Sequence, residues 1–236
     1  MTERITPAAT VVPLRDGAGG LEVLMLRRNP RGAFGGMWVF PGGQVDEQDL
    51  PEVPAAGDEM SAARQAAVRE AFEEAAVRLD PSDLVVLSFW LPPREAPRRF
   101  ATWFFLAPVR SDVQVVVDRG EIHEHRWMSP AAAMDLRQSG DIDLAPPTFT
   151  TLWWLSRHGG VDSALQAAAS RAPERFETRV VPSGDGRPAA MVWAGDAAYE
   201  DGDLDRPGWR RRLLVVAGAW EVQMSEDPEG PPCAGR

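Results

Sequence analysis

The sequence contains no lysine and only one cysteine, and each of these features limits the chemistry that the chain can perform. All 25 of its basic residues other than histidine are arginine, which excludes a Schiff base on a lysine amine and a phosphate-binding lysine in a nucleotide loop. The one cysteine, Cys233, stands in a tail rich in proline and glycine. A disulfide framework needs cysteines in pairs, so it is excluded, and we expect a cytoplasmic location.

Long apolar runs and a surplus of positive charge are also missing. No run approaches the roughly 18 apolar residues that a membrane-spanning helix needs. Residues 1–7 lack the basic patch followed by an apolar segment that is typical of a signal peptide. The formal net charge is −10, and phosphate contacts need basic surface. We therefore expect neither a membrane nor a nucleic acid as partner.

The pattern of apolar residues predicts an α/β fold. Short apolar or β-branched runs predict strands at residues 9–14, 21–27, 38–40, 84–91, 100–109, 113–118 and 123–128. Helices are expected at 61–79, 129–137 and 146–157, the first from the spacing of Val68, Phe72, Ala75 and Leu79. This order predicts an α/β/α sandwich with a mixed sheet over residues 1–157. Residues 158–236, with one Ala-rich helix and three weak strands, are expected to form a small α+β C-terminal extension.

The candidate chemistry lies in Arg69-Glu70-Ala71-Phe72-Glu73-Glu74. On a helix, the three glutamates fall on one side, away from the expected apolar stripe. Three carboxylates within about one turn repel one another, and a divalent cation would turn that repulsion into a binding site. Hard oxygen ligands suit Mg²⁺ or Mn²⁺. A solvated acidic helix face is the alternative interpretation of these residues taken alone.

A second element upstream favours the metal site. Phe40-Pro41-Gly42-Gly43 predicts a strand end followed by a turn whose glycines permit close backbone approach. Together, the turn and the acidic helix resemble the Nudix hydrolases, whose box is Gly-x5-Glu-x7-Arg-Glu-U-x-Glu-Glu-x-Gly-U, where U is a bulky apolar residue. Gly43 matches the first glycine, and Arg69, Glu70, Glu73, Glu74 and Val77 match the second half of the box.

Three features depart from that consensus. The gap from Gly43 to Arg69 is 12 residues longer. The middle glutamate position is Ser61, although Asp58 and Glu59 are near. The late glycine is Ala76, and Ala71 is a small residue at a bulky apolar position. The middle glutamate is mainly structural in the family, so its loss is expected to affect stability more than chemistry. Ala76 is expected to disturb only the end of the helix.

The resemblance implies a mechanism and a set of site residues. It places Glu73, Glu74 and the carbonyl of Gly42 around Mg²⁺ or Mn²⁺, with Glu70 near the same shell, and it implies no organic cofactor. Glu70 is the first choice for the general base, with Glu121 and Glu124 as alternatives. Arg69 is expected to hold the helix through an ion pair.

The substrate implied is a small nucleoside diphosphate linked to another group. A long insertion after Phe40-Pro41-Gly42-Gly43, with Arg99-Phe100-Ala101-Thr102 and Arg126-Trp127-x-x-Pro130, resembles the Nudix branch that includes coenzyme A diphosphatases. Coenzyme A or an acyl-coenzyme A is thus the leading candidate. ADP-ribose, a dinucleotide and a non-catalytic nucleotide-sensing role remain alternatives. A homodimer is also expected, with the C-terminal extension covering a partner subunit.

Overall fold

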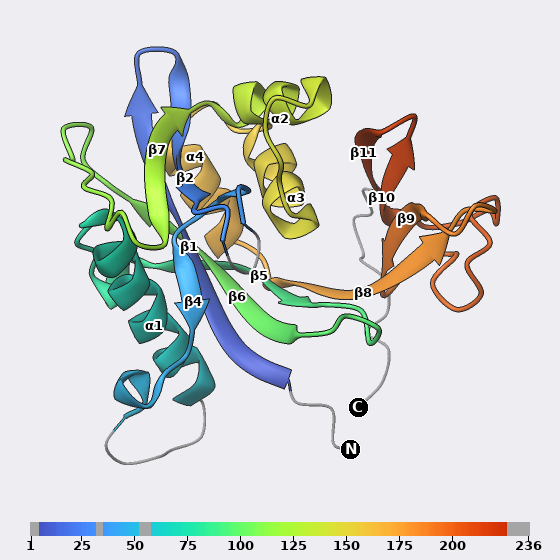
Figure 1. The fold of residues 1–236 in the computed structure, drawn as a ribbon, viewed down its shortest axis with the longest axis horizontal. Coiled ribbons are helices and arrows are strands. Elements are labelled where there is room, and N and C mark those ends of the chain that lie inside the picture. Colours follow the sequence, from blue (N-terminus) through green and yellow to red (C-terminus); the bar gives the residue numbers. More distant parts are fainter. Residues whose placement is uncertain (1–4, 32–34, 52–57, 226–236) are drawn as a thin grey trace.

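The computed structural model of the chain describes residues 5–31, 35–51 and 58–225 (Figure 1). Its helices are α1 (Asp58–Ala75), α2 (Pro130–Ser139), α3 (Pro146–Leu155) and α4 (Val161–Ala169). Its strands are β1 (Ile5–Gly17), β2 (Gly20–Arg28), β3 (Trp38–Val39), β4 (Gly42–Gln44), β5 (Val85–Leu91), β6 (Arg99–Pro108), β7 (Ile122–Met128), β8 (Glu174–Pro182), β9 (Pro188–Trp193), β10 (Arg211–Val216) and β11 (Ala219–Met224). None of the helices in this part of the chain has the length and apolarity that a bilayer crossing requires.

One mixed sheet organises the molecule. Among the described strands the order is β11-β10-β9-β8-β5-β6-β1-β2-β3, while β4 pairs with β1 and β7 with β2. The long strand β1 runs parallel to β6 and antiparallel to β2. In Figure 1, α1 lies against one face of this sheet, and α2, α3 and α4 lie on the other side. The expected α/β/α sandwich with a mixed sheet is confirmed.

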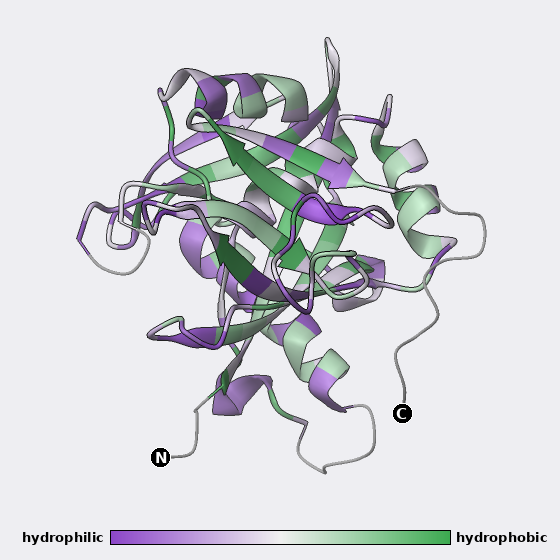
Figure 2. Ribbon diagram, turned by 90° about the vertical axis from the view of Figure 1, so that its right-hand side faces the viewer, coloured by the Kyte–Doolittle hydropathy of each residue, from purple (hydrophilic) through white to green (hydrophobic). Residues whose placement is uncertain are grey.

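The sheet separates two hydrophobic clusters, as the alternation along β1 requires. Val12 and Leu14 face the cluster covered by α3 and α4, whereas Ala9 and Val11 face the cluster beneath α1. Apolar residues concentrate on the inner strands and polar residues on loops and outer helix faces (Figure 2). Burial of both sheet faces therefore explains why the central strands carry nearly continuous apolar runs.

The buried face of α1 is built from alanine, and the predicted stripe is confirmed only in part: Ala75 is buried and Val68 and Leu79 pack against the cluster beneath α1, but Phe72 does not. Phe72 is 44% exposed, with the Arg78 guanidinium 4.4 Å from its ring centroid. The buried apolar residues of the helix are Ala62, Ala63, Ala66, Ala67, Ala71 and Ala75. A helix that contacts a sheet through alanine can approach it closely. A search for bulky apolar side chains does not detect a buried face that is made of such small residues.

The helix also starts earlier and ends earlier than predicted. It begins at Asp58 and stops at Ala75, because Ala76 adopts the left-handed conformation with φ 56°. The Ala76 amide then donates to the Phe72 carbonyl, and the Val77 amide to the Ala71 carbonyl. This hydrogen-bond pattern closes a helix at a residue that is usually glycine, which explains why the family consensus has glycine there.

Three other segments differ from the sequence-based prediction. Gly42 and Gly43, predicted as a turn, belong to β4 and pair antiparallel with β1. Residues 113–118 form no strand; Val113, Val115 and Val117 instead pack against the cluster beneath α1. The strand β11 was not predicted, although its Trp220 packs edge-on against Phe149 of α3 at 5.4 Å. The alternating valines thus correctly indicated that one side of this segment is buried. They do not show whether a neighbouring strand is present to form the hydrogen bonds that a strand needs.

The C-terminal segment continues the sheet. Residues 174–177 of β8 pair in parallel with β5, and residues 178–182 then pair antiparallel with β9. At this junction Trp90 of β5 stacks on Phe176 of β8 with ring centroids 4.0 Å apart. The division into residues 1–157 and 158–236 stays a prediction, and the two parts share a continuous set of strands.

Candidate active site

Arg69 organises the acidic helix from its centre. Its Nε donates to Asp49 Oδ1 at 3.0 Å and its Nη2 to Asp49 Oδ2 at 2.9 Å. Nη2 also donates to the Gln44 carbonyl at 2.9 Å. The hydrogen bond with Asp49 is the largest of the causes that raise the pKa of Arg69. This forked geometry fixes α1 to the segment that follows Gly43.

Asp49 is a residue that the sequence analysis missed. It ends the short 3-10 helix Glu47–Asp49 and is only 4% exposed. Counted forward from Gly43, Asp49 occupies the middle acidic position of the box, whereas the count back from Arg69 gave Ser61. The assignment of Ser61 was therefore wrong, and the extra residues lie between Asp49 and Arg69. Counting from both conserved ends of the box would have found it.

Glu74 is buried between α1 and the strand β4, which contains Gly42 and Gly43. Its Oε2 accepts the Gly42 amide hydrogen at 3.0 Å, and its Oε1 lies 3.4 Å from Arg28 Nη1. The pKa of Glu74 is raised to about 8: burial is the largest cause, the charges of Glu70 and Glu121 add to it, and the Gly42 amide and Arg28 oppose it. The expectation that this side chain points away from the core was wrong, since it is only 4% exposed.

Glu70 lies against Gly43, the second glycine of β4. A Cβ atom placed on Gly43 would clash with the Glu70 carboxylate, so a larger residue there would force this carboxylate out of its observed position. Arg69 Nη1 donates to Glu70 Oε1 at 2.8 Å. Burial raises the pKa of Glu70, the Arg69 contact lowers it, and the charges of Glu73 and Glu121 raise it again.

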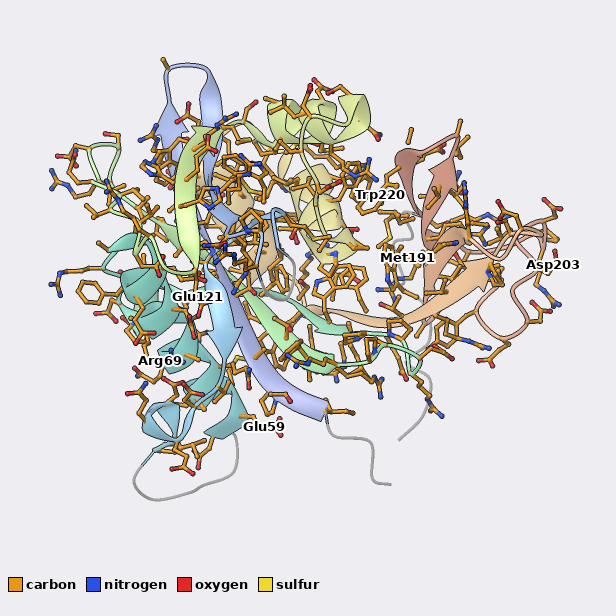
Figure 3. All side chains as sticks on the ribbon, viewed as in Figure 1. Glu59, Arg69, Glu121, Met191, Asp203 and Trp220 are labelled. Carbon is orange, nitrogen blue, oxygen red and sulfur yellow. The ribbon has the colours of Figure 1, made fainter. Side chains whose placement is uncertain are left out.

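Glu121 reaches the same place from the loop before β7. Arg28 Nη2 donates to Glu121 Oε2 at 2.6 Å while its Nη1 contacts Glu74. The guanidinium of Arg28 thus lies between two carboxylates, and Arg28 was not predicted to belong to the site. Figure 3 shows Glu121 beside α1, on the side where Arg69 also lies. The structure therefore brings together Glu70, Glu74 and Glu121.

Three predicted contributors are placed differently. Glu73 is 53% exposed at its side chain and pairs with Arg69 at 2.9 Å. Glu124 pairs with Arg126 and Arg27, and these contacts hold its pKa below the ordinary value although partial burial raises it. Gly42 meets the site through its amide N–H rather than through its carbonyl.

The chemistry of these donors fits a divalent cation. Within the described ranges, no cluster of three or more His, Cys, Asp or Glu side chains has a geometry that holds a metal ion as it stands. Yet the charges of Glu70 and Glu121 raise the pKa of Glu74, and the charge of Glu121 raises the pKa of Glu70, at a site where burial already disfavours charge. A hard cation would compensate this excess of negative charge, and carboxylate oxygens are the ligands that Mg²⁺ prefers.

Comparisons with a family model and with individual proteins point to the same family. The family model described as "NUDIX domain" matches residues 4–148. Nudix hydrolase 7 of Caenorhabditis elegans is 29% identical over 58% of this chain, and the match spans 56% of that protein's length. Acyl-coenzyme A diphosphatase NUDT19 of Homo sapiens is 26% identical, over 86% of this chain and 78% of its own.

A solved structure supports the fold. The crystal structure of a NUDIX hydrolase from Alicyclobacillus acidocaldarius superposes with a TM-score of 0.60 at 23% identity, covering 73% of this chain and 99% of that one. At this level of identity the similarity establishes the shared architecture.

Proposed function

We propose, from the premise that this chain belongs to the Nudix family, that it is a hydrolase of diphosphate bonds that depends on a divalent metal ion. The observation that carries the proposal is the convergence of Glu70, Glu74 and Glu121 beside Gly42 and Gly43. Three acidic groups from two distant segments meet at one point of the fold. Scaffolding alone does not require them to do so.

The metal is proposed to be Mg²⁺ or Mn²⁺. Glu70 and Glu74 would hold it, and Glu121 lies at the same site. Glu73 and the carbonyl of Gly42 complete the expected set, which would require Glu73 to leave Arg69 and Gly42 to present its carbonyl in place of its amide. When bound, the ion neutralises the charge of a diphosphate. Arg69 keeps this turn of the helix fixed through its contacts with Asp49 and Gln44. A metal site requires that its ligands be held rigidly in the productive geometry, and these contacts provide that support.

Glu70 is proposed as the general base that takes a proton from the attacking water. Its half-buried carboxylate has a raised pKa, and a more basic carboxylate accepts a proton more readily. Glu121 is the alternative, since it lies at the same site. Glu124 fits the role less well, because two arginines already occupy its oxygens and hold its pKa low.

The substrate is proposed to be a nucleoside diphosphate linked to a second group, with coenzyme A or an acyl-coenzyme A as the leading candidate. Hydrolysis between the phosphorus atoms would give two monophosphates. The similarity to an acyl-coenzyme A diphosphatase over 86% of the chain supports this choice. ADP-ribose and dinucleotides are the competing substrates.

A panel of diphosphates with Mg²⁺ tests the proposal: coenzyme A, an acyl-coenzyme A, ADP-ribose, NADH and a dinucleoside polyphosphate. Glu73→Gln and Glu70→Gln are compared with wild type for turnover and for nucleotide binding. Glu22→Gln, which breaks an ion pair with Arg15 on the β1–β2 hairpin, is the matched control. Cleavage of ADP-ribose but not of coenzyme A would reject the proposed substrate and keep the enzyme. Nucleotide binding without turnover of any compound would favour a sensing role.

The assembly and location are proposed as well. We expect a homodimer in the cytoplasm, formed through the C-terminal extension, whose β11 lies at the end of the sheet. A monomer mass by light scattering at micromolar concentration would reject the dimer.

A further inference from the structure

The loop before β7 brings Glu121 to the acidic site from outside the regular elements. Glu121 precedes the first residue of β7 and lies in no helix or strand, and its side chain is 67% exposed. Arg28 nevertheless joins it to Glu74, through its Nη2 and Nη1 atoms respectively. Loops are ordinarily more mobile than the elements they connect. The place of Glu121 at the site therefore depends on what holds this loop.

Asp118 holds the backbone of the loop. Its Oδ2 accepts hydrogen bonds from the amide nitrogens of Gly120 at 3.1 Å and Glu121 at 2.8 Å, and its Oδ1 accepts one from Ile122 at 2.8 Å. One carboxylate thus binds three consecutive amides, the last of which belongs to the first residue of β7. Hydrogen bonds to an ionised carboxylate are stronger than those between neutral groups. Asp118 therefore ties Glu121 to the start of the strand.

The two residues between Asp118 and Glu121 are shaped by these contacts. Arg119 adopts φ 61°, a conformation that is unfavourable for a residue with a Cβ atom. A Cβ atom on Gly120 would lie 2.9 Å from Asp118 Oδ2, so glycine leaves room for the carboxylate. Unfavourable backbone conformations persist where surrounding contacts stabilise them. The loop therefore keeps its shape because the Asp118 carboxylate binds its amides.

Asn29 holds the same loop from the end of β2. Its amide donates to the Glu121 carbonyl at 2.6 Å, and its Nδ2 donates to the Gly120 carbonyl at 3.2 Å. Both backbone polar groups of Glu121 are thus hydrogen-bonded, the amide to Asp118 and the carbonyl to Asn29. Asn29 directly follows Arg28, which holds the Glu121 side chain. Asp118 is the member of this set whose side chain can be changed without altering β2 or Arg28.

We propose that Asp118 is a positioning residue of the acidic site, and that it fixes Glu121 where its carboxylate joins Glu70 and Glu74 around the cation. The inference rests on the proposed function, because it requires a divalent cation at this site. Asp118 itself contacts neither the cation nor the substrate. Without its carboxylate the three amides would turn to water and the loop would take other conformations. Glu121 would then occupy its place at the site for only part of the time.

A double-mutant cycle tests this role. Wild type, Asp118→Ala, Glu121→Gln and the double variant are compared for turnover at saturating Mg²⁺ and for Mn²⁺ binding by calorimetry. Asp118→Ala should lower kcat by about tenfold or more with little change in KM, because it displaces a group at the acidic site. Its Mn²⁺ binding should weaken several-fold. In the Glu121→Gln background the same change should alter both quantities by less than about twofold, because no carboxylate is left to position.

A conservative variant and a matched control accompany the cycle. Asp118→Asn keeps one oxygen that can accept the amides of Gly120 and Glu121, so it should recover part of the turnover that Asp118→Ala loses. Asp185→Ala is the control, because Asp185 also accepts an amide hydrogen bond within its own turn, from Arg187 at 3.1 Å. That turn joins β8 to β9, which β5 and β6 separate from the acidic site. The control should leave turnover and Mn²⁺ binding unchanged.

Hydrogen exchange reads the loop without any metal. In EDTA, the amides of residues 120–122 should exchange faster in Asp118→Ala than in wild type. In Glu121→Gln they should exchange as in wild type, because the carboxylate of Asp118 still binds them. This readout separates the placement of the loop from the chemistry that the loop supports.

Four results would overturn the proposal. Equal losses from Asp118→Ala in the wild-type and Glu121→Gln backgrounds would mean that Asp118 acts through another group. Turnover and Mn²⁺ binding within about twofold of wild type, or unchanged exchange of residues 120–122, would show that Glu121 keeps its place without Asp118. Wild type that binds no Mn²⁺ would reject both this role and the proposed function. Wild type that binds Mn²⁺ but hydrolyses no diphosphate would reject the proposed function alone, and the Mn²⁺ cycle would then decide the role of Asp118. Where Asp118→Ala folds poorly, Asp118→Asn takes its place in the cycle.

Discussion

Two buried carboxylates in different regions of this molecule have opposite environments. Asp196, in the C-terminal segment, accepts hydrogen bonds from the Arg212 guanidinium and from the amides of Arg211 and Ala198. Burial raises its pKa, but these contacts outweigh burial and lower the pKa overall. Glu74 has one amide and a 3.4 Å contact with Arg28, and its pKa rises to about 8.

The difference distinguishes a stabilising group from a site group. Asp196 has its hydrogen bonds satisfied, so the negative charge is stable in the folded protein. Glu74 is held by surrounding packing in a place where its charge is unfavourable. Residues in such environments are enriched at functional sites, where a bound ligand compensates the charge that the protein leaves uncompensated.

The largest expected effect follows from removing the charge of Glu74. Glu74→Gln keeps the shape of the side chain but loses a proposed metal ligand, so turnover with Mg²⁺ should fall on the order of a thousandfold, or about 4 kcal/mol. Stability in EDTA at pH 9, where the wild-type carboxylate is ionised, should stay equal or rise. Turnover within about twofold of wild type would show that the two carboxylates do not differ in function.

The second prediction concerns the free energy of unfolding instead of turnover. Asp196→Asn leaves the Arg212 side chain charged and 2% exposed without its carboxylate, and breaking a buried pair costs roughly 3–5 kcal/mol. Urea unfolding should record this loss, while turnover per folded molecule stays close to wild type. Asp185→Asn, on an exposed turn, is the control. A loss below about 1 kcal/mol would mean that the pair contributes little.

The pH dependence of stability should have opposite signs for the two groups. Because the pKa of Glu74 is raised from 4.5 to about 8, the folded state binds the proton more tightly. Stability of the metal-free protein should therefore fall by about 1.4 kcal/mol per pH unit between these values. Asp196, with a lowered pKa, contributes stability above its ordinary pKa of 3.8, which is lost as the pH falls through the folded value.

Chemical denaturation in EDTA across this range, with Glu74→Gln and Asp196→Asn alongside wild type, separates the two contributions. Glu74→Gln should flatten the decline toward pH 8, and Asp196→Asn should reduce the loss in acid. Parallel curves for Glu74→Gln and wild type would contradict the assigned environment of Glu74.

The smallest effect concerns a second unfavourable feature near Glu74. Ala76 ends α1 with φ 56°, whereas α2 ends at Gly140 with φ 83°. Ala76→Gly should stabilise the protein by about 1 kcal/mol, because glycine adopts this conformation without a Cβ clash. Gly140→Ala is the matched reverse change and should destabilise by a similar amount in thermal unfolding. A destabilised Ala76→Gly would show that the Ala76 methyl group packs favourably.

The sequence alone predicted most of the elements and the pairing of the glycine turn with the acidic helix, because these depend on local patterns. It did not predict how deep each side chain lies. Phe72 was expected in the core and Glu74 outside it, and the alanine face of α1 reverses both. Arg28 was missed since its role depends on contacts with residues far along the chain, whereas Asp49 was missed only because the box was counted from one end.

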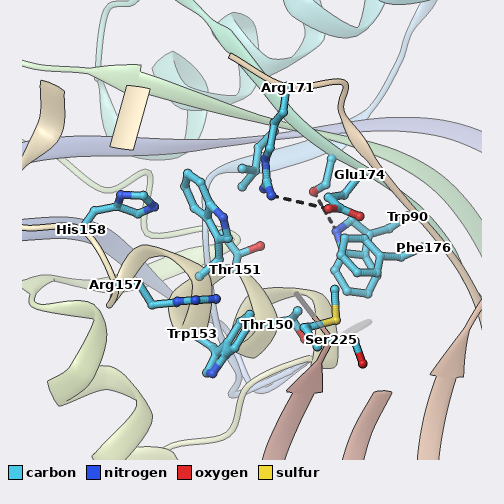
Figure 4. Close-up of a pocket in the computed structure, with 14 residues that line it drawn as sticks. Trp90, Thr150, Thr151, Trp153, Arg157, His158, Arg171, Glu174, Phe176 and Ser225 are labelled. Carbon is cyan, nitrogen blue, oxygen red and sulfur yellow. Dashed lines mark hydrogen bonds and ion pairs between the residues drawn. The ribbon is translucent and has the colours of Figure 1, made fainter. Parts of the chain in front are cut away.

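The parallel pairing of β8 with β5 has a consequence for truncated forms of the protein. A fragment that stops at residue 157 would lack β8, so the outer side of β5 would present unpaired amide and carbonyl groups along residues 88–91. Trp90 would also lose the ring of Phe176 that stacks on it (Figure 4). Exposed strand edges with aromatic side chains are templates for intermolecular β-pairing. The shortened protein should therefore self-associate and precipitate, even though every residue of the acidic site would still be present.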